Sequence, residues 1–398
     1  MDGAVYALLL LCGLVVLIKR GVRWAPVFKQ NKWICLFFLY LGFSILWSPD
    51  LFVSTKRWVK ELGHVVVILV VFSEKDPAAA ARAFLARCAY LLIPLSVLVV
   101  KYYPWISRTY DSWTFEPCIS GICSDKNLFG MTLFVCAVPL VWLSLSSLDP
   151  GLRKQDPRAR LRYLSLLVMA VWLLTQAHSA TAQTCTMLAT AILVGFKLPS
   201  LRSRARHLGI YLSLIAILVV ILQSTGAWDA LWGGFVRMLG REPELTGRTP
   251  IWRAVLKEDI NPLFGTGFYS FWTIERARRI ADSAGLFYLL NEAHDGYIET
   301  YLNSGLIGLT LLVVVIVNAF NRYKKDALVG FGLASLRLAF IIAIVLYNVT
   351  ESAFDRLTPV RFALLFAIIQ WRAPAALRVG ATDEPAGCKE PNMEPAAC

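Results

Sequence analysis

Charged side chains are scarce in this sequence. Lysine, arginine, aspartate and glutamate make up 17% of the 398 residues, whereas they make up about a quarter of an average soluble domain. Hydrophobic residues account for 57% of the chain, and the mean hydropathy is +0.58. This composition excludes an ordinary soluble globular protein and predicts one that crosses a membrane several times.

The signatures of common cofactor sites are also missing. The sequence has no glycine-rich loop with a lysine for holding phosphate groups, no His-Glu-x-x-His motif, and no Asp-x-Asp in a segment predicted to face outward. The Gly-Thr-Gly of residues 265–267 lacks the strand and helix of a nucleotide-binding unit, so we interpret it as a turn. We therefore predict neither a cofactor nor a bound metal.

The surplus of positive charge follows the predicted topology. Lysine and arginine number 40 against 27 acidic residues, which gives a net charge of +13. Such a surplus can indicate nucleic-acid binding, but here the basic residues fall in short connections on alternate sides of apolar runs. Basic connections mark the cytoplasmic side of membrane proteins. We therefore predict lipid bilayer contact and no nucleic-acid partner.

Eleven apolar runs are predicted as membrane spans. The expected fold class is all-α: a polytopic integral membrane protein with about eleven transmembrane helices and one large periplasmic loop. The runs lie near residues 3–18, 33–47, 63–73, 88–101, 127–148, 163–176, 180–196, 208–222, 303–320, 327–349 and 358–371. No basic residue precedes the first run and several follow it, so it is predicted to be a retained span and not a cleaved signal peptide.

The runs divide the chain into four regions. These are the N-terminal helices of residues 1–222, a large loop of residues 223–302, the C-terminal helices of residues 303–371, and a tail of residues 372–398. The tail is rich in proline, alanine and glutamate and is predicted to be disordered and cytoplasmic. The basic connections around residues 19–32, 154–162, 198–207 and 321–326 are predicted to be cytoplasmic, which places the 223–302 loop in the periplasm of a bacterium.

Two shorter outward connections carry features of their own. Cys118 and Cys123 lie in the same connection, where an oxidising compartment permits a disulfide, and a pair of free thiols is the alternative. Residues 48–63 alternate apolar and basic side chains at helical spacing. They are predicted to lie in the plane of the membrane interface.

Seven motifs occur in order along the chain, and several fall in the 223–302 loop. They are WSPDLFVSTKRWVKE from residue 47, SDKNLFG from 124, a Ser-x-Thr from 179, TGRTPIW from 246, NPLFGTGFYSFW from 261, EAHDGYIETYLNSGLIGL from 292 and NVTESAFDR from 348. Together they resemble the O-antigen ligase and Wzy-type polysaccharide polymerase superfamily, and most closely its ExoQ-like exopolysaccharide polymerase branch. The resemblance covers nearly the whole chain.

The resemblance implies a GT-C-like glycosyltransferase in the bacterial inner membrane, with its active site facing the periplasm. The donor would be a glycan on a polyprenyl diphosphate, and the acceptor a sugar hydroxyl on another lipid-linked repeat unit. The missing Asp-x-Asp agrees with a lipid-linked donor in place of a nucleotide sugar. A chain-length regulator is an expected partner.

Arg248 matches the Gly-Arg signature of the superfamily and is predicted to be catalytic. A polyprenyl diphosphate leaves readily only if its growing negative charge is met, and without a metal this requires fixed cations. Arginine is always charged, and its forked donors bind phosphate oxygens in pairs. The alternative is a loop arginine paired with Glu242 or Glu244. Trp252 is predicted to share the helical face of Arg248.

His294, at the entry to a predicted span, matches the superfamily's histidine in the EAHDGY motif and is the predicted catalytic base. An imidazole can take a proton from an acceptor hydroxyl at neutral pH, and direct attack by that hydroxyl would invert the anomeric centre. Tyr297 is predicted to share a helical face with His294 and to contact the substrate. The alternative is an interfacial histidine beside a belt of aromatic residues.

Two phosphates call for a second cation, and here the sequence departs from the superfamily. Members usually carry lysine or arginine inside the Ser-x-Thr motif, where this chain has Ala180. Arg57 and Lys126 are the preferred replacements because both lie in matching motifs beside outward ends of spans; contact with lipid headgroups is the alternative. The predicted diphosphate-binding or sugar-binding residues are Arg57, Lys126, Arg241, Tyr297 and Glu351, with Lys60 and Arg356 as further candidates.

Three other functions compete with polymerisation. An O-antigen ligase would differ only in its acceptor, lipid A core. A transporter or flippase of lipid-linked sugars is expected to carry ionisable residues inside its spans and internal repeats, and neither feature is clear in this sequence. A scaffold without catalysis is favoured only by the missing cation at Ala180. Convergence of Arg248 and His294 would favour an enzyme over a transporter.

Overall fold

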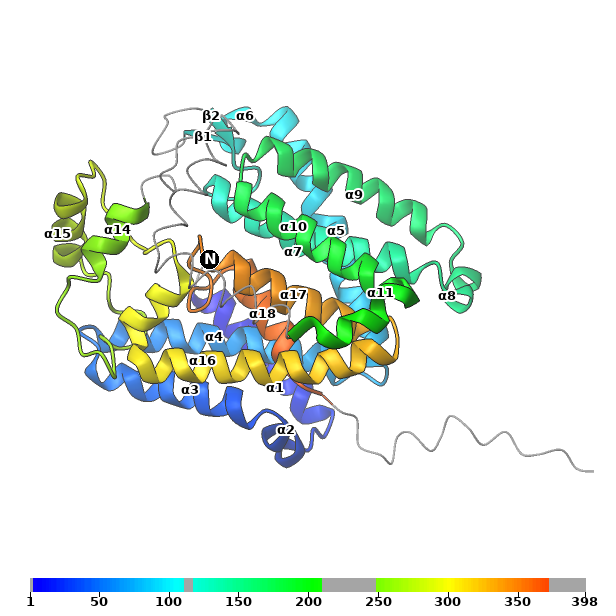
Figure 1. The fold of residues 1–398 in the computed structure, drawn as a ribbon, viewed down its shortest axis with the longest axis horizontal. Helices are drawn as coiled ribbons and strands as arrows, with labels where there is room; N and C mark the ends of the chain where they lie inside the picture. The colour runs from blue at the N-terminus through cyan, green and yellow to red at the C-terminus, as the bar shows by residue number, and fades with distance from the viewer. Residues whose placement is uncertain (1–2, 111–116, 210–247, 372–398) are drawn as a thin grey trace, which may run out of the picture.

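The structure is a bundle of helices. A computed structural model describes residues 3–110, 117–209 and 248–371, and Figure 1 shows their arrangement. The first part contains α1 (Gly3–Lys19), α2 (Trp24–Gln30), α3 (Lys32–Ser44), η1 (Ile45–Trp47), α4 (Leu51–Phe72), α5 (Pro77–Tyr102), α6 (Pro104–Ser107) and β1 (Arg108–Tyr110). The second contains β2 (Pro117–Ile119), α7 (Lys126–Ser146), α8 (Pro150–Gln155), α9 (Ala159–Gln176), α10 (Ala180–Lys197), α11 (Pro199–Arg204) and η2 (Ala205–His207). The third contains α14 (Arg248–Val255), α15 (Ile274–Ala284), α16 (Gly296–Val329), α17 (Leu333–Tyr347) and α18 (Pro359–Ile368).

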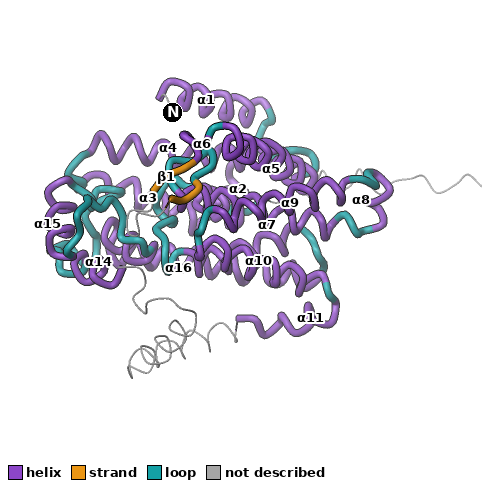
Figure 2. The backbone as a smooth tube through the Cα atoms, turned by 90° about the horizontal axis from the view of Figure 1, so that it is seen from above, coloured by secondary structure: helices purple, strands orange, loops and turns teal. Residues whose placement is uncertain are grey.

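Helix α7 forms the centre of the bundle. It packs against α5, α9, α10, α17 and α18, and Figure 2 shows α5, α7, α9 and α10 running beside one another. Almost every residue of α7 is buried, because its sequence is apolar on all sides and has no polar stripe to turn towards water. Phe129, Phe134 and Trp142 are fully buried in this core.

The positions of the helices agree well with the predicted apolar runs, but the number of membrane spans does not agree with the prediction. Ten of the eleven runs overlap a helix of the described residues, and the run at 208–222 lies almost wholly outside those residues. By length and composition, α5, α7 and α16 can each cross a membrane, and two sharply bent helix pairs raise the number to five. The protein is thus a helical membrane protein with fewer full-length spans, among the described residues, than the eleven predicted.

Two segments differ from the expected division into spans and connections. Residues 48–63 do not form a separate interfacial segment, because α4 runs without a break from Leu51 to Phe72. Asp50 caps this helix by accepting a hydrogen bond from the backbone N–H of Val53 at 2.9 Å. Residues 321–326, predicted as a connection, belong to α16, which continues to Val329.

A buried ion pair joins the N-terminal and C-terminal parts of the bundle. Glu61 of α4 and Arg361 of α18 lie 3.0 Å apart, and each side chain is 1% exposed. Arg361 also lies over the rings of Phe37 and Phe38, with its guanidinium carbon 5.8 Å from each ring centre. A charge in such surroundings is tolerated only when it is paired, so each residue depends on the other.

Helix α16 is broken near its start. Gly305 has φ 63° and ψ −168°, which divides the helix into a short first arm and a long second arm. The turn at residues 261–267 fills the break: the N–H groups of Leu306 and Gly267 donate to the carbonyl oxygens of Pro262 and Asn303 at 2.9 Å each. This turn is the Gly-Thr-Gly segment, and it has no nucleotide-binding context. The first arm is therefore held to the 223–302 loop.

The end of the bundle that carries the 223–302 loop lies opposite the end that carries the basic segments. Helices α14 and α15 lie at one end in Figure 1, where the connection from α17 to α18 also turns. They share a small core with the first arm of α16, built around Ile251, Phe271 and Leu302. The basic segments in α8, in α11 and at the end of α16 lie at the other end. This arrangement agrees with a membrane protein that separates its loops by charge.

The predicted disulfide is not formed. Cys118 and Cys123 are both free thiols. Cys118 pairs with Thr109 across the hairpin of β1 and β2, and its sulfur lies 3.3 Å from the Thr109 hydroxyl. The sulfur of Cys123 lies 3.5 Å from the hydroxyl of Thr132 on α7. Each thiol is held by a different element, so the structure agrees with the second of the two alternatives, a pair of free thiols.

Candidate active site

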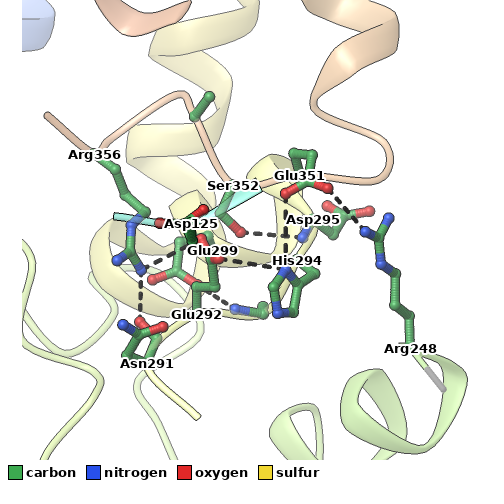
Figure 3. A network of polar contacts seen from close by, with 12 residues as sticks. Asp125, Arg248, Asn291, Glu292, His294, Asp295, Glu299, Glu351, Ser352 and Arg356 are labelled. Carbon is green, nitrogen blue, oxygen red and sulfur yellow. Dashed lines mark hydrogen bonds and ion pairs between the residues drawn. The ribbon is translucent and has the colours of Figure 1, made fainter. Parts of the chain in front are cut away.

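The candidate site forms where three segments distant in sequence meet. Arg248 is the first residue of α14, His294 lies two residues before α16, and Glu351 lies in the connection between α17 and α18. Figure 3 shows these three side chains turned towards one another. The two residues predicted to be catalytic from their motifs therefore converge on one carboxylate.

Glu351 is the common partner of the two predicted catalytic residues. Its Oε1 accepts a hydrogen bond from Arg248 Nη2 at 2.9 Å, and its Oε2 lies 3.8 Å from His294 Nδ1. The side chain of Glu351 is only 3% exposed, against 15% for Arg248 and 18% for His294. Arg248 is thus paired with Glu351, whereas Glu242 and Glu244, its alternative partners, lie outside the described residues.

A second carboxylate approaches His294 from the same segment. Glu292 Oε1 lies 3.3 Å from His294 Nδ1, and Glu292 Oε2 lies 3.5 Å from Arg356 Nη1. The first distance is short, but its angles are not those of a hydrogen bond, since His294 Nδ1 has no hydrogen-bond partner among the described residues. Arg356 Nη1 also donates to the carbonyl oxygen of Asn291 at 2.6 Å. The histidine is therefore flanked by two carboxylates, each held by an arginine.

The predicted second cations lie on either side of this cluster. Lys126, at the start of α7, interacts electrostatically with Glu351 and Arg248. Arg57 of α4 donates to the carbonyl oxygen of Tyr269 at 2.8 Å and lies over the Tyr269 ring at 4.1 Å. Arg356 lies over the same ring at 5.8 Å. Arg57 is thereby connected to the cluster through Tyr269, whereas Lys126 acts on it directly.

Backbone contacts hold His294 against the α17–α18 connection. The N–H of Asp295 donates to Ser352 Oγ at 3.1 Å, and that of Gly296 donates to the Asn348 carbonyl at 2.7 Å. Asp295 also caps α16, because its carboxylate accepts from the N–H groups of residues 297 and 298 at 2.8 Å. These contacts hold together the two backbone segments that carry His294 and Glu351.

Helix α14 supports the same segment from the other side. The indole N–H of Trp252 donates to the carbonyl oxygen of Ala293 at 2.9 Å. Arg248 and Trp252 lie one helical turn apart on α14, as their spacing predicts. The tryptophan therefore links the helix that carries Arg248 to the residue before His294.

Burial changes the ionisation of two groups beside His294. Desolvation raises the pKa of Asp295 to about 6, although two backbone hydrogen bonds and the nearby Arg248 oppose the shift. Burial disfavours the charge of Arg356, but Glu292, Tyr269 and other acidic neighbours outweigh it and raise the Arg356 pKa above its ordinary value. Arg356 is therefore a permanent cation.

Not every residue predicted for the site joins it. The hydroxyl of Tyr297 donates to the carbonyl oxygen of Val345 at 2.8 Å, and its ring packs edge-on against Phe354. Since α16 begins at Gly296, His294 precedes the helix and does not share a helical face with Tyr297. Arg241 lies outside the described residues.

The Ser-x-Thr motif lies next to the site without supplying a charge. Ser179 precedes α10, Ala180 is its first residue, and the hydroxyl of Thr181 lies 2.8 Å from that of Thr350. Thr350 is the neighbour of Glu351. The position of the missing cation is thus beside the cluster, where Lys126 and Arg248 provide positive charge.

Two comparisons with known proteins match this chain. The family described as O-antigen ligase matches residues 163–313. The exopolysaccharide production protein ExoQ of Rhizobium meliloti (strain 1021) is 25% identical over 393 residues, which cover 90% of this chain and 81% of that protein. Both matches support the resemblance of this chain to the O-antigen ligase and ExoQ-like superfamily. The residues that match the family include Arg248, His294 and the break in α16 at Gly305.

Three site residues had little signal in the sequence. Glu292 stands two residues before His294, and an acidic residue so close to a candidate base was the available clue. Arg356 was one of several candidate cations, and only the ion pair with Glu292 distinguishes it. Tyr269 lies in a matching motif, but its contacts with Arg57 and Arg356 depend on the tertiary fold.

A metal ion has one candidate location among the described residues. Glu292, His294 and Glu351 each offer a ligand atom, and these atoms lie within 4.8 Å of one another. Both carboxylates, however, are also paired with guanidinium groups, and Lys126 adds another positive charge. Fixed cations compete with a divalent ion for the same oxygen atoms. The arrangement is better matched to an anionic substrate than to a metal.

Proposed function

We propose that this protein is a membrane glycosyltransferase that polymerises polyprenyl-diphosphate-linked oligosaccharide repeat units into exopolysaccharide or O-antigen. The similarity to the O-antigen ligase family and to ExoQ supports an activity of the polymerase or ligase type. The observation that carries the proposal is the convergence of Arg248 and His294 on Glu351. A transporter has no need to bring a phosphate-binding arginine and a proton acceptor together.

The proposed roles follow from the charges at the site. Arg248 and Lys126 meet the negative charge that develops on the leaving diphosphate, and Lys126 supplies the cation missing at Ala180. Arg57 and Arg356 both lie over the ring of Tyr269. They are the cations proposed to contact a phosphate or a sugar of the substrate. His294 takes the proton of the acceptor hydroxyl, and attack from the side opposite the leaving group inverts the anomeric centre.

The proposed setting is the bacterial inner membrane with the site facing the periplasm. The separation of the site from the basic segments supports this orientation, because basic connections stay in the cytoplasm. A lipid-linked donor reaches such a site from the bilayer, and the growing glycan leaves into the periplasm. A chain-length regulator is the proposed protein partner.

An O-antigen ligase is the second candidate, and one observation favours it. The matching family is described as O-antigen ligase, whereas the matching full-length relative is an exopolysaccharide production protein. The two activities share the donor and the site proposed here. They differ only in whether the acceptor hydroxyl belongs to another repeat unit or to lipid A core.

The decisive experiment is a transfer assay without added metal. Wild-type protein in nanodiscs is incubated with the lipid-linked repeat unit of its host, beside Arg248→Ala and His294→Ala, and the glycans are separated by size. We expect a ladder from the wild type and losses of about 100-fold or more in both variants. Product only when lipid A core is added would establish a ligase. No product with either acceptor would rule out both enzymes.

A further inference from the structure

The carboxylate of Glu351 is satisfied on one side only. Its Oε1 accepts a hydrogen bond from Arg248, whereas its Oε2 is buried, has no hydrogen-bond partner among the described residues and faces His294 Nδ1 at 3.8 Å. In the same part of the chain, His294 Nδ1 has no hydrogen-bond partner either. The two buried atoms thus lie about 1 Å beyond hydrogen-bonding distance. Figure 3 shows the two side chains facing each other.

We propose that Glu351 is a positioning residue that exchanges Arg248 for His294 when the lipid diphosphate binds. This inference rests on the proposed function. The diphosphate oxygens take the donors of Arg248, and the released carboxylate moves about 1 Å to accept the Nδ1–H of His294. The Nε2 lone pair of the histidine is then directed at the acceptor hydroxyl. The base is therefore aligned only when the donor is present.

The chemical step balances without further reactants. The acceptor O–H bond breaks and its proton goes to His294 Nε2, while the acceptor oxygen forms the new bond to the anomeric carbon. The bond from that carbon to the phosphate oxygen breaks, and its electron pair stays on the leaving diphosphate beside Arg248. Glu351 takes no proton in this step and, by accepting the Nδ1–H, stabilises the imidazolium that forms.

Glu292 is not equivalent to Glu351 in this exchange. It lies 3.3 Å from the same nitrogen, but its other oxygen faces Arg356, not Arg248. Among the residues that the structure describes, only Glu351 connects the arginine that meets the diphosphate with the histidine that takes the proton. The backbone contacts of Asp295 and Gly296 with residues 352 and 348 allow the side chain to move while the two segments stay together.

The kinetic test compares Glu351→Gln with Glu258→Gln. Glu258 pairs with Arg276 and Arg279 in the same loop and does not contact the site, so it is a matched control for loss of a paired carboxylate. We expect Glu351→Gln to lower kcat by at least tenfold while the donor KM stays the same or falls, because Arg248 is no longer occupied. A purely structural role would raise KM and lower thermal stability. Full kcat in Glu351→Gln would overturn the proposal.

A spectroscopic test follows the hydrogen bond directly. The chain has only four histidines, so 15N-imidazole spectra are assignable, with His294→Gln identifying the signal of interest. Inorganic pyrophosphate is the probe. We expect it to move the Nδ1–H resonance of His294 downfield in the wild type and in Glu258→Gln, but not in Glu351→Gln. An unchanged His294 signal at saturating pyrophosphate in the wild type would refute the exchange.

The two tests separate this inference from the proposed function. Wild-type protein that shows the His294 shift but makes no glycan product retains the exchange and loses the proposed activity. Wild-type protein that makes the ladder but shows no shift retains the activity and loses the exchange.

Discussion

Backbone strain is concentrated at the proposed site. Three non-glycine residues of the described chain have left-handed φ angles: His178 at 50°, Tyr269 at 57° and His294 at 53°. Each such residue costs on the order of 1 kcal/mol, and such costs persist where surrounding contacts hold the chain in place. Tyr269 lies between two arginines, His178 precedes the Ser-x-Thr motif, and His294 is the proposed base. Strain and chemistry thus coincide.

The indole of Trp252 is expected to hold the proposed base in position. Trp252→Phe keeps most of the side-chain volume but removes the donor to the Ala293 carbonyl, which is expected to cost about 1 kcal/mol of stability. We expect kcat to fall about tenfold with little change in donor KM, because the neighbouring histidine loses its alignment. Trp105→Phe is the control, since Trp105 is 73% exposed on α6. Equal kcat values in the two variants would remove Trp252 from the site.

The buried carboxyl of Asp295 is expected to make stability depend on pH. Its pKa is about 6 in the folded protein against 3.8 as the ordinary value. The folded state therefore binds the proton more tightly, and this stabilisation is present below about pH 3.8 and is lost as the pH rises through about 6. Asp295→Asn keeps the helix cap without the charge. At pH 7 we expect the variant to be more stable than the wild type by up to about 3 kcal/mol.

Thermal unfolding in detergent between pH 5 and pH 8 tests this expectation. The advantage of Asp295→Asn should shrink steadily as the pH is lowered from 7 to 5. A difference that does not change with pH would show that the carboxyl is ionised alike in the folded and unfolded chains.

Sequence motifs predicted which residues lie at the site better than they predicted the contacts between those residues. Arg248 and His294 were predicted from motif and charge, and the structure brings them to one carboxylate. Glu351 was predicted as a substrate-binding residue, but its position between the two depends on the connection from α17 to α18. Tyr297 carried the same kind of motif signal, yet its hydroxyl is used to pack α16 against α17.

At the scale of elements, the break in α16 connects the loop to the bundle. The first arm carries Glu299 and Asn303, which face the loop one turn apart. Glu299 accepts hydrogen bonds from the Trp272 indole and the Ala293 N–H at 2.8 Å, and the Asn303 side chain accepts from the N–H groups of residues 270 and 271. The loop that carries Glu292 and His294 is thus built on the arm before the break.

Gly305→Ala is expected to disrupt this connection. An alanine Cβ would lie 2.2 Å from the backbone oxygen of Leu263, and the φ and ψ of Gly305 are accessible essentially only to glycine. We expect a loss of at least about 3 kcal/mol in stability and of most transferase activity. Gly330→Ala is the matched control, because it lies at the end of the same helix with φ −168° and open space around it. Equal melting temperatures for the two variants would contradict this account of the break.

Hydropathy predicted where helices occur but not where they bend or end. Residues 303–320 were predicted as one span although they begin with Asn-Ser-Gly, and their overall hydropathy does not show the break at Gly305. The break is stabilised by the turn at residues 261–267, about forty residues earlier in the chain. Residues 321–326 are polar and were predicted as a connection, yet they continue α16. Hydropathy also failed at residues 48–63. Their basic side chains lower the hydropathy there, so the first half of α4 was not predicted as part of that helix.

At the scale of the molecule, the site and the basic segments occupy opposite ends. If this separation reflects the membrane, the two ends lie in different compartments. Alkaline phosphatase fused after Phe287, which is fully exposed beside α15, is expected to be active, because the enzyme needs an oxidising compartment. A fusion after Leu201 in the basic α11 is expected to be inactive. The same result from both fusions, at equal expression, would contradict the orientation.

The ion pair between Glu61 and Arg361 bears on biogenesis. The two residues are 300 positions apart, so α4 is synthesised long before its partner helix. An unpaired carboxylate is costly in apolar surroundings, and we expect α4 to settle into the bundle only after α18 has been translated. The same event brings the α17–α18 connection, with Glu351, against His294. A ribosome-bound chain that ends before α18 should therefore lack the proposed transferase activity. Incomplete chains would then not use up the proposed lipid-linked substrate.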